Sequence, residues 1–319
     1  MTKRKKGIKP HFYILLGLFS ILLVIILWFF ESRNSIWNKY TNTTLILNTK
    51  PVLLISFNHI NNELNIFSIP SNVFLEVSGG YGKYRIGKLF ALDKQEKRSG
   101  KLILNSASNA FGIPVDGFID FNQKELSKKE EDFKRDDFFA TKNSLMAGLD
   151  TLTFGNLTIS DVIKFDYSVL IVRGSKVKIT NLFQNYAFTP IQLPDYNKAF
   201  IFDYRIIDSF LRLSGGDQKI VQENLKVEIL NSTKYSGLAE KAARIIENAG
   251  GKVVNIGNVE KLSLLKCQIY SDKNLVKSYT FLRLKKFFEC QMNVGKYSES
   301  RSDITIVLGD NYRRNFEND

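Results

Sequence analysis

The sequence predicts an α+β protein with an N-terminal transmembrane helix and two folded domains after it. Three observations indicate this class. Residues 12–30 form an apolar run without a charge, residues 50–218 carry short strand patterns with a few helical stretches, and residues 222–313 follow the order β-α-β-β-α-β. The chain is therefore expected to hold one membrane segment, a larger first domain and a small two-layer C-terminal domain.

The apolar run FYILLGLFSILLVIILWFF is nineteen residues long. As a helix it spans roughly 28 Å, close to the ~30 Å hydrocarbon core of a bilayer. Five cations and no acid precede it: Lys3, Arg4, Lys5, Lys6 and Lys9. This asymmetry predicts that the basic tail, residues 1–11, stays in the cytoplasm and that the rest of the chain lies outside.

A cleaved secretory signal is the alternative for this segment. However, the run is longer than the usual ~7–15 residues of a signal peptide, and bulky Trp28 and Phe29 stand where small cleavage-site residues belong. We therefore expect an uncleaved signal anchor, which makes this a single-pass protein of the cell membrane whose lipid partner is the bilayer. Residues 31–49, which are polar and rich in Asn and Thr, are expected to form a juxtamembrane linker.

The composition indicates folded domains with a positive surface. Aromatic residues make up 13% of the chain, and the formal net charge is +13, of which +8 remains outside the tail. Such an excess suits polyanions, for example lipid head groups or phosphate-bearing glycopolymers, and no nucleic-acid-binding motif accompanies it. A solvated basic surface without a ligand explains the same charge.

The scarcity of histidine and cysteine argues against several kinds of chemistry. The chain holds two of each and has no CxxC, HExxH or Cys/His cluster, so no zinc or haem site is predicted. His11 lies in the tail, and His59 stands in a predicted turn. Nothing near His59 in the sequence suggests a catalytic triad.

Strand patterns open the first domain. Residues 51–58, 64–70 and 73–77 are expected to be strands, with a polar turn between the first two. The glycine-rich stretch 79–82 follows them. A loop that cradles phosphate needs a helix directly after it, so an ordinary turn is favoured.

A short helix over residues 101–112 and an alternating strand over 115–121 are expected next. Asp116 and Asp120 have the same parity on that strand and so are expected on one face. A carboxylate pair there would suit acid-base work or a metal, although solvent-facing polar positions explain both residues as well. The mixed charges of residues 123–137 predict an exposed segment.

Residues 167–172 and 176–180 flank Gly174 and Ser175, a pattern typical of a β-hairpin. The prolines of residues 190–194 require an extended segment or a loop. A short helix is expected at 206–213, and residues 217–219 then mark a domain boundary.

The C-terminal domain has the clearest pattern. Two helices are expected, at 238–249, where the apolar residues fall on one face, and at 276–289. Four strands are expected at 225–230, 252–257, 264–270 and 303–309. This order predicts a two-layer sandwich with both helices on one face of the sheet.

That topology brings Cys267 and Cys290 near one another. The helix after the third strand returns about 25 Å against about 20 Å of strand, so Cys290 is expected near the beginning of the strand that holds Cys267. Outside the cell a disulfide is chemically allowed, and two buried free thiols are the equal alternative.

Residues 225–312 resemble the C-terminal domain found with the LytR-CpsA-Psr family of envelope proteins. The resemblance rests on the segments VEILNSTKYSGLAEKAARIIENAGGKVVNIGN and DITIVLGDNY. Upstream, PVLLISFN, NIFSIP and FGIPVDGFIDF are similar to parts of the catalytic domain of that family. The resemblance implies an α/β domain with a mixed sheet for residues 50–218 and a LytR C-terminal domain for residues 222–313.

The resemblance also implies a chemistry, the transfer of a glycopolymer from a polyprenyl-pyrophosphate carrier to the cell wall. Arginines would hold the pyrophosphate and acids would bind magnesium, because a dianionic leaving group needs both kinds of charge. Here Ser71 and Asn72 stand where the family has Arg-Asp, and Lys50 stands where it has an acid. The first domain is therefore expected to be a degenerate relative.

Two hypotheses about function follow. The first is a non-catalytic envelope protein without cofactor or metal, which binds or scaffolds anionic wall glycopolymer, a lipid-linked precursor or assembly machinery. The second is a divergent phosphotransferase that uses magnesium. Its candidate residues are Lys83, Arg85, Lys88, Asp116 and Asp120.

Overall fold

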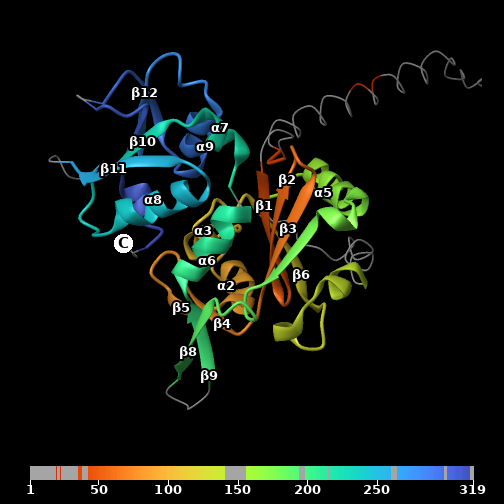
Figure 1. The fold of residues 1–319 in the computed structure, drawn as a ribbon. Coiled ribbons are helices and arrows are strands. Elements are labelled where there is room, and N and C mark those ends of the chain that lie inside the picture. The colour runs from red at the N-terminus through yellow and green to blue at the C-terminus, as the bar shows by residue number, and fades with distance from the viewer. Residues whose placement is uncertain are drawn as a thin grey trace, which may run out of the picture.

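The computed structural model describes residues 19, 22, 35–37, 42–140, 156–193, 198–214, 216–259, 264–297 and 300–316. Within these ranges the chain is a mixture of helices and mixed sheets (Figure 1), which confirms the predicted α+β class. No helix in this part of the chain is long and apolar enough to cross a membrane. The anchor expected at residues 12–30 lies outside the described residues except for Phe19 and Leu22, and it stays a prediction.

The first domain is built on a five-stranded sheet in the order β6-β1-β2-β3-β7. Its strands are β1 (Asn42–Lys50), β2 (Val52–Asn58), β3 (Glu63–Ile69), β6 (Gly117–Glu125) and β7 (Val177–Asn181). The first three strands form an antiparallel meander, whereas β6 lies parallel to β1 and β7 lies parallel to β3. The expected mixed sheet is therefore present.

The linker predicted over residues 31–49 is wrong for its second half, because Asn42 to Thr49 form most of a buried strand. Its Asn and Thr residues suggested a solvated linker, but their polar groups find partners inside the protein. The Asn48 amide donates to Asp120 at 2.6 Å and the Thr49 hydroxyl donates to the carbonyl of Pro51 at 2.6 Å. Buried polar groups that are hydrogen-bonded fit a strand interior, and threonine has a high β propensity.

Both faces of this sheet are covered (Figure 1). Helices α2 (Leu89–Gln95) and α3 (Lys101–Phe111) pack over one face, where Ile46 and Leu54 are buried. Helix α5 (Ile159–Ile171) lies over the opposite face, against Leu45, Leu47 and Leu53. Because both faces are buried, the strands appear in the sequence as nearly continuous apolar runs instead of an alternation.

The hairpin predicted around Gly174 is wrong. Residues 167–171 belong to α5, and β7 pairs with the distant strand β3. The helix begins with a capping box in which Thr158 and Asp161 satisfy each other's backbone N–H groups. Val162, Phe165 and Val169 are buried at helical spacing, a signal that the β-branched composition of SVLIV masked.

A second sheet, in the order β5-β4-β9-β8, extends the domain at the bottom of Figure 1. It comprises β4 (Val73–Val77), β5 (Gly82–Arg85), β8 (Phe188–Gln192) and β9 (Lys198–Phe202). Pro190 lies on β8, an edge strand. An edge strand tolerates proline, which has no backbone N–H to donate. Helix α6 (Tyr204–Ser214) follows, and the short helices of this domain are η1 (Ile86–Lys88), η2 (Glu130–Asp132) and η4 (Gly174–Lys176).

The C-terminal domain holds a five-stranded sheet in the order β11-β10-β14-β12-β13. Its strands are β10 (Lys226–Asn231), β11 (Lys252–Asn258), β12 (Gln268–Ser271), β13 (Gln291–Val294) and β14 (Ile304–Leu308). Its helices are α7 (Gln218–Glu223), α8 (Leu238–Asn248), α9 (Tyr279–Phe287) and α10 (Asp310–Arg313). The predicted series is present, and the sheet has one further edge strand, β13. The sequence did not predict this strand because its four residues, QMNV, alternate polar and apolar side chains over too short a run to indicate a strand.

A disulfide joins Cys267 and Cys290, whose Cα atoms lie 4.4 Å apart. Cys267 precedes β12 and Cys290 precedes β13, and these two strands are parallel neighbours. The bond therefore connects the starts of the two strands across the return of α9. This is the first of the two alternatives that the sequence left open.

Candidate functional site

The three candidate cations lie on an exposed part of the first domain. Lys83 and Arg85 belong to β5, and Lys88 ends η1 directly after it. Every residue of β5 is exposed, and the Arg85 guanidinium carbon lies 5.5 Å from the ring centroid of Phe74. Because charges at the surface stay hydrated and screened, this position favours a solvated basic surface over a dry phosphate site.

The two candidate acids do not form a pair. The Asp116 carboxylate accepts from the backbone N–H of Thr44 at 3.0 Å and from the guanidinium of Arg283, a residue of α9 in the other domain. Asp120 accepts instead from the side chain of Asn48 at 2.6 Å. Asp116 thus contributes to domain docking, whereas Asp120 lies opposite Asn48 where β6 pairs with β1.

The end of β6 contributes to a polar group that we call the sheet-edge cluster: Asn48, Ser71, Asn72, Asp120 and Glu130. The carboxyl ends of the parallel strands β1 and β6 lie at this edge, where open α/β sheets bind ligands. Ser71 donates its hydroxyl to Glu130 at 2.8 Å, and its carbonyl accepts the N–H of Gly87 at 3.0 Å. The turn at Ser71 and Asn72 is therefore closed by a glutamate.

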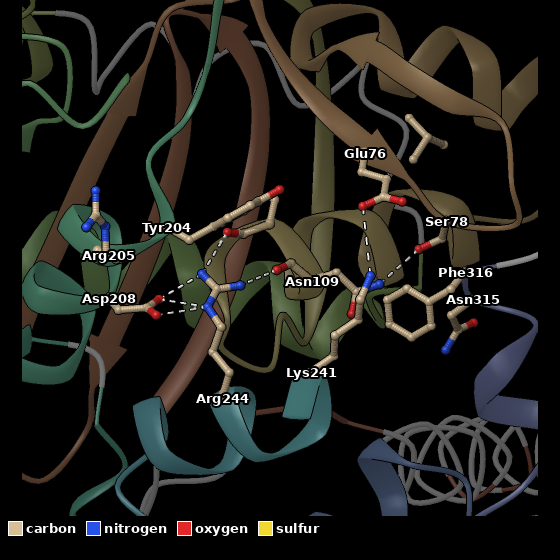
Figure 2. A pocket seen from close by; sticks show the side chains of 12 residues that line it. Glu76, Ser78, Asn109, Tyr204, Arg205, Asp208, Lys241, Arg244, Asn315 and Phe316 are labelled. Atoms are coloured by element: carbon tan, nitrogen blue, oxygen red, sulfur yellow. Dashed lines mark hydrogen bonds and ion pairs between the residues drawn. The ribbon is translucent and has the colours of Figure 1, made fainter. Parts of the chain in front are cut away.

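A hollow lies between the two domains (Figure 2). We call it the interdomain cavity, and its volume is about 260 Å³. Strand β4, helices α3 and α6, helix α8 and the segment after α10 all contribute to it. Its lining residues are Glu76, Val77, Ser78, Asn109, Ala110, Tyr204, Arg205, Asp208, Lys241, Arg244, Asn315 and Phe316.

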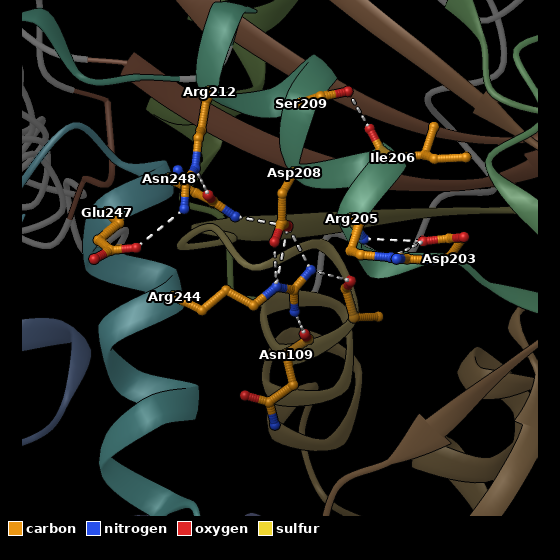
Figure 3. A network of polar contacts seen from close by, with 11 residues as sticks. Asn109, Asp203, Arg205, Ile206, Asp208, Ser209, Arg212, Arg244, Glu247 and Asn248 are labelled. Carbon is orange, nitrogen blue, oxygen red and sulfur yellow. Dashed lines mark hydrogen bonds and ion pairs between the residues drawn. The ribbon is translucent and has the colours of Figure 1, made fainter.

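Arg244 of α8 forms one wall of the cavity and links the domains (Figure 3). Its Nε and Nη2 atoms donate to the Asp208 carboxylate at 2.7 to 3.0 Å. Its two Nη groups also donate to the carbonyls of Asn109 at 2.6 Å and Ala110 at 3.1 Å. These carbonyls belong to the last turn of α3, where a helix lacks internal donors and carries partial negative charge. The arginine therefore caps a helix of the other domain.

Lys241, one turn before Arg244, contributes a further cation to the cavity (Figure 2). Its ammonium lies 4.3 Å from the ring centroid of Phe316 and 3.9 Å from the Glu76 carboxylate. Tyr204 lies at the other end, with its ring under the Arg244 guanidinium at 4.7 Å. Burial, and then the charge of Glu76, raise the pKa of Tyr204, so its hydroxyl keeps its proton at neutral pH. The cavity thus combines two aromatic rings with hydrogen-bonding groups of both kinds.

Sequence reasoning missed Tyr204, Lys241, Arg244 and Phe316. In the helical pattern of α8, Arg244 lies opposite the apolar face and Lys241 lies at its border, and both placements are typical of residues exposed to solvent. A signal for Arg244 was also present at Gly112. A Cβ atom there would lie 2.7 Å from the Arg244 guanidinium carbon, and Gly112 has a φ of +64°. The glycine is needed both for the end of α3 and for the approach of the arginine.

The comparisons with known proteins agree with part of the sequence analysis. Residues 224–312 match the family model described as LytR cell envelope-related transcriptional attenuator. The recognition of a LytR C-terminal domain in this part of the chain is therefore confirmed. No curated protein matches the chain.

Several solved structures are similar to this chain. "TagT bound to LIIa-WTA" has 12% identity and a TM-score of 0.39, over 56% of this chain and 92% of that one. "Crystal structure of B. subtilis TagT" has 12% identity and a TM-score of 0.37 over the same shares. "LytR-CPS2A-psr family protein YwtF (TagT) with bound octaprenyl pyrophosphate lipid" has 12% identity and a TM-score of 0.38, over 55% and 91%. At such identities the role of each residue here is judged from its own contacts.

Proposed function

We propose that this chain is a membrane-anchored, extracytoplasmic protein of the cell envelope that binds or scaffolds wall glycopolymer, or the machinery that assembles it, without transferring it. The carrying observation is the sheet-edge cluster, in which Ser71 and Asn72 are neutral and Ser71 is bound by Glu130. The confirmed C-terminal domain belongs to an envelope-related family, which supports the setting.

The charges at the sheet edge argue against transfer. Moving a phosphoryl group from a pyrophosphate carrier requires cations at the leaving group and carboxylates for magnesium. Glu130 at the turn adds negative charge where a cation would be needed, and Asp116 is held by Arg283 at the domain interface. Binding without transfer requires neither, and the interdomain cavity offers a place for it.

One observation favours the second function, a divergent magnesium-dependent phosphotransferase. The side-chain oxygens Asn48 Oδ1 and Asn72 Oδ1 are buried and have no hydrogen-bond partner. A buried acceptor without a donor is costly, and a cation or a ligand hydroxyl would relieve that cost. Asp120, which accepts from the Asn48 amide at 2.6 Å, places a carboxylate beside the first of these oxygens, and oxygen donors of this kind suit a hard cation.

An assay of the full-length protein in detergent micelles distinguishes the two functions. The protein is given a lipid-linked glycopolymer donor with and without magnesium, and release of polyprenyl phosphate is followed beside binding of the polymer. We expect binding without release. Magnesium-dependent release that Arg85→Ala and Asp120→Asn abolish would overturn the non-catalytic proposal.

A further inference from the structure

We infer that the interdomain cavity and the basic hollow beside it form one binding site for an anionic glycan, with a sugar ring in the cavity and its acidic group in the hollow. The inference rests on the proposed envelope function. It adds where the ligand binds and which hollow holds the sugar ring and which the acidic group. Three features carry it: the aromatic walls, the adjoining cations and the side chains that the two hollows share.

The cavity has the chemistry of a sugar subsite. A pyranose ring has an apolar face of C–H groups and an edge of hydroxyls, so it is recognised by aromatic rings together with donors and acceptors. Tyr204 and Phe316 supply the rings, and Glu76 and Lys241 supply an acceptor and a donor (Figure 2). Four charged side chains besides Lys241 line the same space, so a long hydrocarbon tail fits it poorly.

The neighbouring hollow, which we call the basic hollow, is wider and polar, with a volume of about 330 Å³. Three cations and one carboxylate line it: Arg98, Lys101, Arg314 and Glu289. Its walls also carry the amides of Asn105 and Asn311. Arginine is suited to phosphate and carboxylate groups because its planar donors can pair with two oxygens at once.

The two hollows adjoin. Ser78 and Asn315 line both of them, so a ligand that fills the cavity reaches the basic hollow over these side chains. Asn315 is held by the amide of Asn105 at 2.7 Å, and its carbonyl accepts the N–H of Gly79 at 3.0 Å. The shared wall is therefore fixed by contacts between the two domains.

Each domain contributes half of this site. Arg98 and Tyr204 come from the first domain, whereas Lys241, Arg314 and Phe316 come from the C-terminal domain. Arg244 docks the domains at one side of the cavity, so the site exists only when they are joined. A glycan bound there would in turn stabilise the docked arrangement.

The test uses the full-length protein in detergent micelles and four probes: a sugar-substituted poly(glycerol phosphate), a polymer of uronic acid, neutral dextran and inorganic polyphosphate. Binding is measured by calorimetry for the natural sequence and for three variants. Arg98→Gln/Lys101→Gln/Arg314→Gln removes the charge of the basic hollow. Lys252→Gln/Lys273→Gln/Lys277→Gln is the control, since it removes the same charge from exposed positions elsewhere. Tyr204→Leu/Phe316→Leu removes the rings.

We expect the two acidic sugar polymers to bind more tightly than dextran or polyphosphate. The ratio of the affinities for the two acidic polymers identifies the acidic group as phosphate or carboxylate. The hollow variant should weaken their binding about tenfold because its three cations line one hollow. The control should weaken it less than twofold because its three cations line neither hollow. The ring variant should weaken them about tenfold but leave polyphosphate unaffected. The melting temperature and circular dichroism spectrum of the ring variant show whether it folds. If it does not fold, Lys241→Met, which removes the donor of the cavity, is used in its place.

Three results would overturn the inference while leaving the proposed function in place: equal losses in the hollow and control variants, equal affinity for polyphosphate, or glycan binding that neither set of variants changes. Phosphatidylglycerol in mixed micelles serves as a fifth probe, and tighter binding to it than to any glycan would overturn the inference in favour of a membrane surface. If none of the natural wall polymers binds the unmodified protein at all, the proposed function fails as well.

Discussion

His59 is a half-buried histidine whose surroundings explain it without catalysis. Its Nε2 lies 2.9 Å from the Thr43 hydroxyl, and its ring packs edge-on against Trp37 and Phe57 at 4.6 and 4.7 Å. Burial lowers the pKa of His59 to about 4, and the charge of Asp116 offsets only part of this shift. The side chain is therefore neutral at physiological pH.

This lowered pKa predicts a pH-dependent stability. In the unfolded chain His59 has a pKa of about 6.5, so between about pH 6.5 and pH 4 the unfolded state binds a proton that the folded state does not. The contribution of His59 to the free energy of unfolding is thus fully present above about pH 6.5 and decreases as the pH falls to about 4. Urea unfolding of the natural protein and His59→Gln across this range measures the difference. A folded-state pKa near 6.5, from NMR titration of the ring, would contradict the prediction.

Arg283 shows how a residue of one domain can settle the role of a residue in another. Burial lowers the pKa of its guanidinium, but the charge and hydrogen bond of Asp116, together with Tyr279 and Asp217, raise it by more. The net shift is upward, and the arginine stays charged. Asp116 therefore has a structural partner, which its parity with Asp120 in the sequence did not reveal.

Among the elements, α5 is a helix that the sequence predicted in part as a strand. Its capping box gives a direct test of the helix. Thr158→Ala removes the hydroxyl that accepts from the N–H of Asp161 at 3.1 Å, and we expect the free energy of unfolding to fall by about 1 kcal/mol. Thr189→Ala, on the exposed face of β8, is the control and should change it by less than about 0.5 kcal/mol. Equal effects of the two changes in urea unfolding would argue against the cap.

The element pair β12 and β13 is held by the disulfide between Cys267 and Cys290. The two residues are 23 positions apart, so in the chain-entropy model closing this loop stabilises the fold by about 3 kcal/mol. We expect the Cys267→Ser/Cys290→Ser variant to lose about that much in urea unfolding. In the natural protein, unfolding without a reductant should leave no thiol reactive towards a labelling reagent. Labelling of both cysteines there would show that the bond is absent.

For the whole molecule, the central feature is the way α8 meets α3 and α6. Arg244 is mostly buried, as is its partner Asp208, with 22% and 18% of the side chains exposed. Removing it leaves two helix-end carbonyls without this donor, and it leaves the Asp208 carboxylate with the amide of Asn248 at 2.8 Å but without its cation. A charge left uncompensated in a buried site costs about 3 kcal/mol.

We therefore expect Arg244→Ala to lower the free energy of unfolding by about 2–3 kcal/mol, discounted for partial exposure, and to speed proteolysis between the domains near residues 214–217. Arg205→Ala is the matched control on α6. Its side chain is 93% exposed, and its loss should have little effect. If both variants unfold and are cleaved like the natural protein, Arg244 does not hold the domains together.

The amino-acid order was sufficient for those features that depend on local pattern. The strands 52–58, 63–69 and 226–231 and the helices α3 and α8 follow from runs of apolar residues, their period and their glycine ends, since each of these acts within one element. The family of the C-terminal domain was recognisable for the same reason, because its motif lies within one continuous segment.

The three-dimensional fold was needed wherever a residue's role depends on a distant partner. Whether 42–49 is linker or strand depends on β6, which lies some seventy positions later in the chain. The interdomain cavity depends on α6, α8 and Phe316 meeting across two domains. Polar side chains such as Arg244 have the same appearance in sequence whether they face water or another helix, because hydropathy records the side chain and not its surroundings.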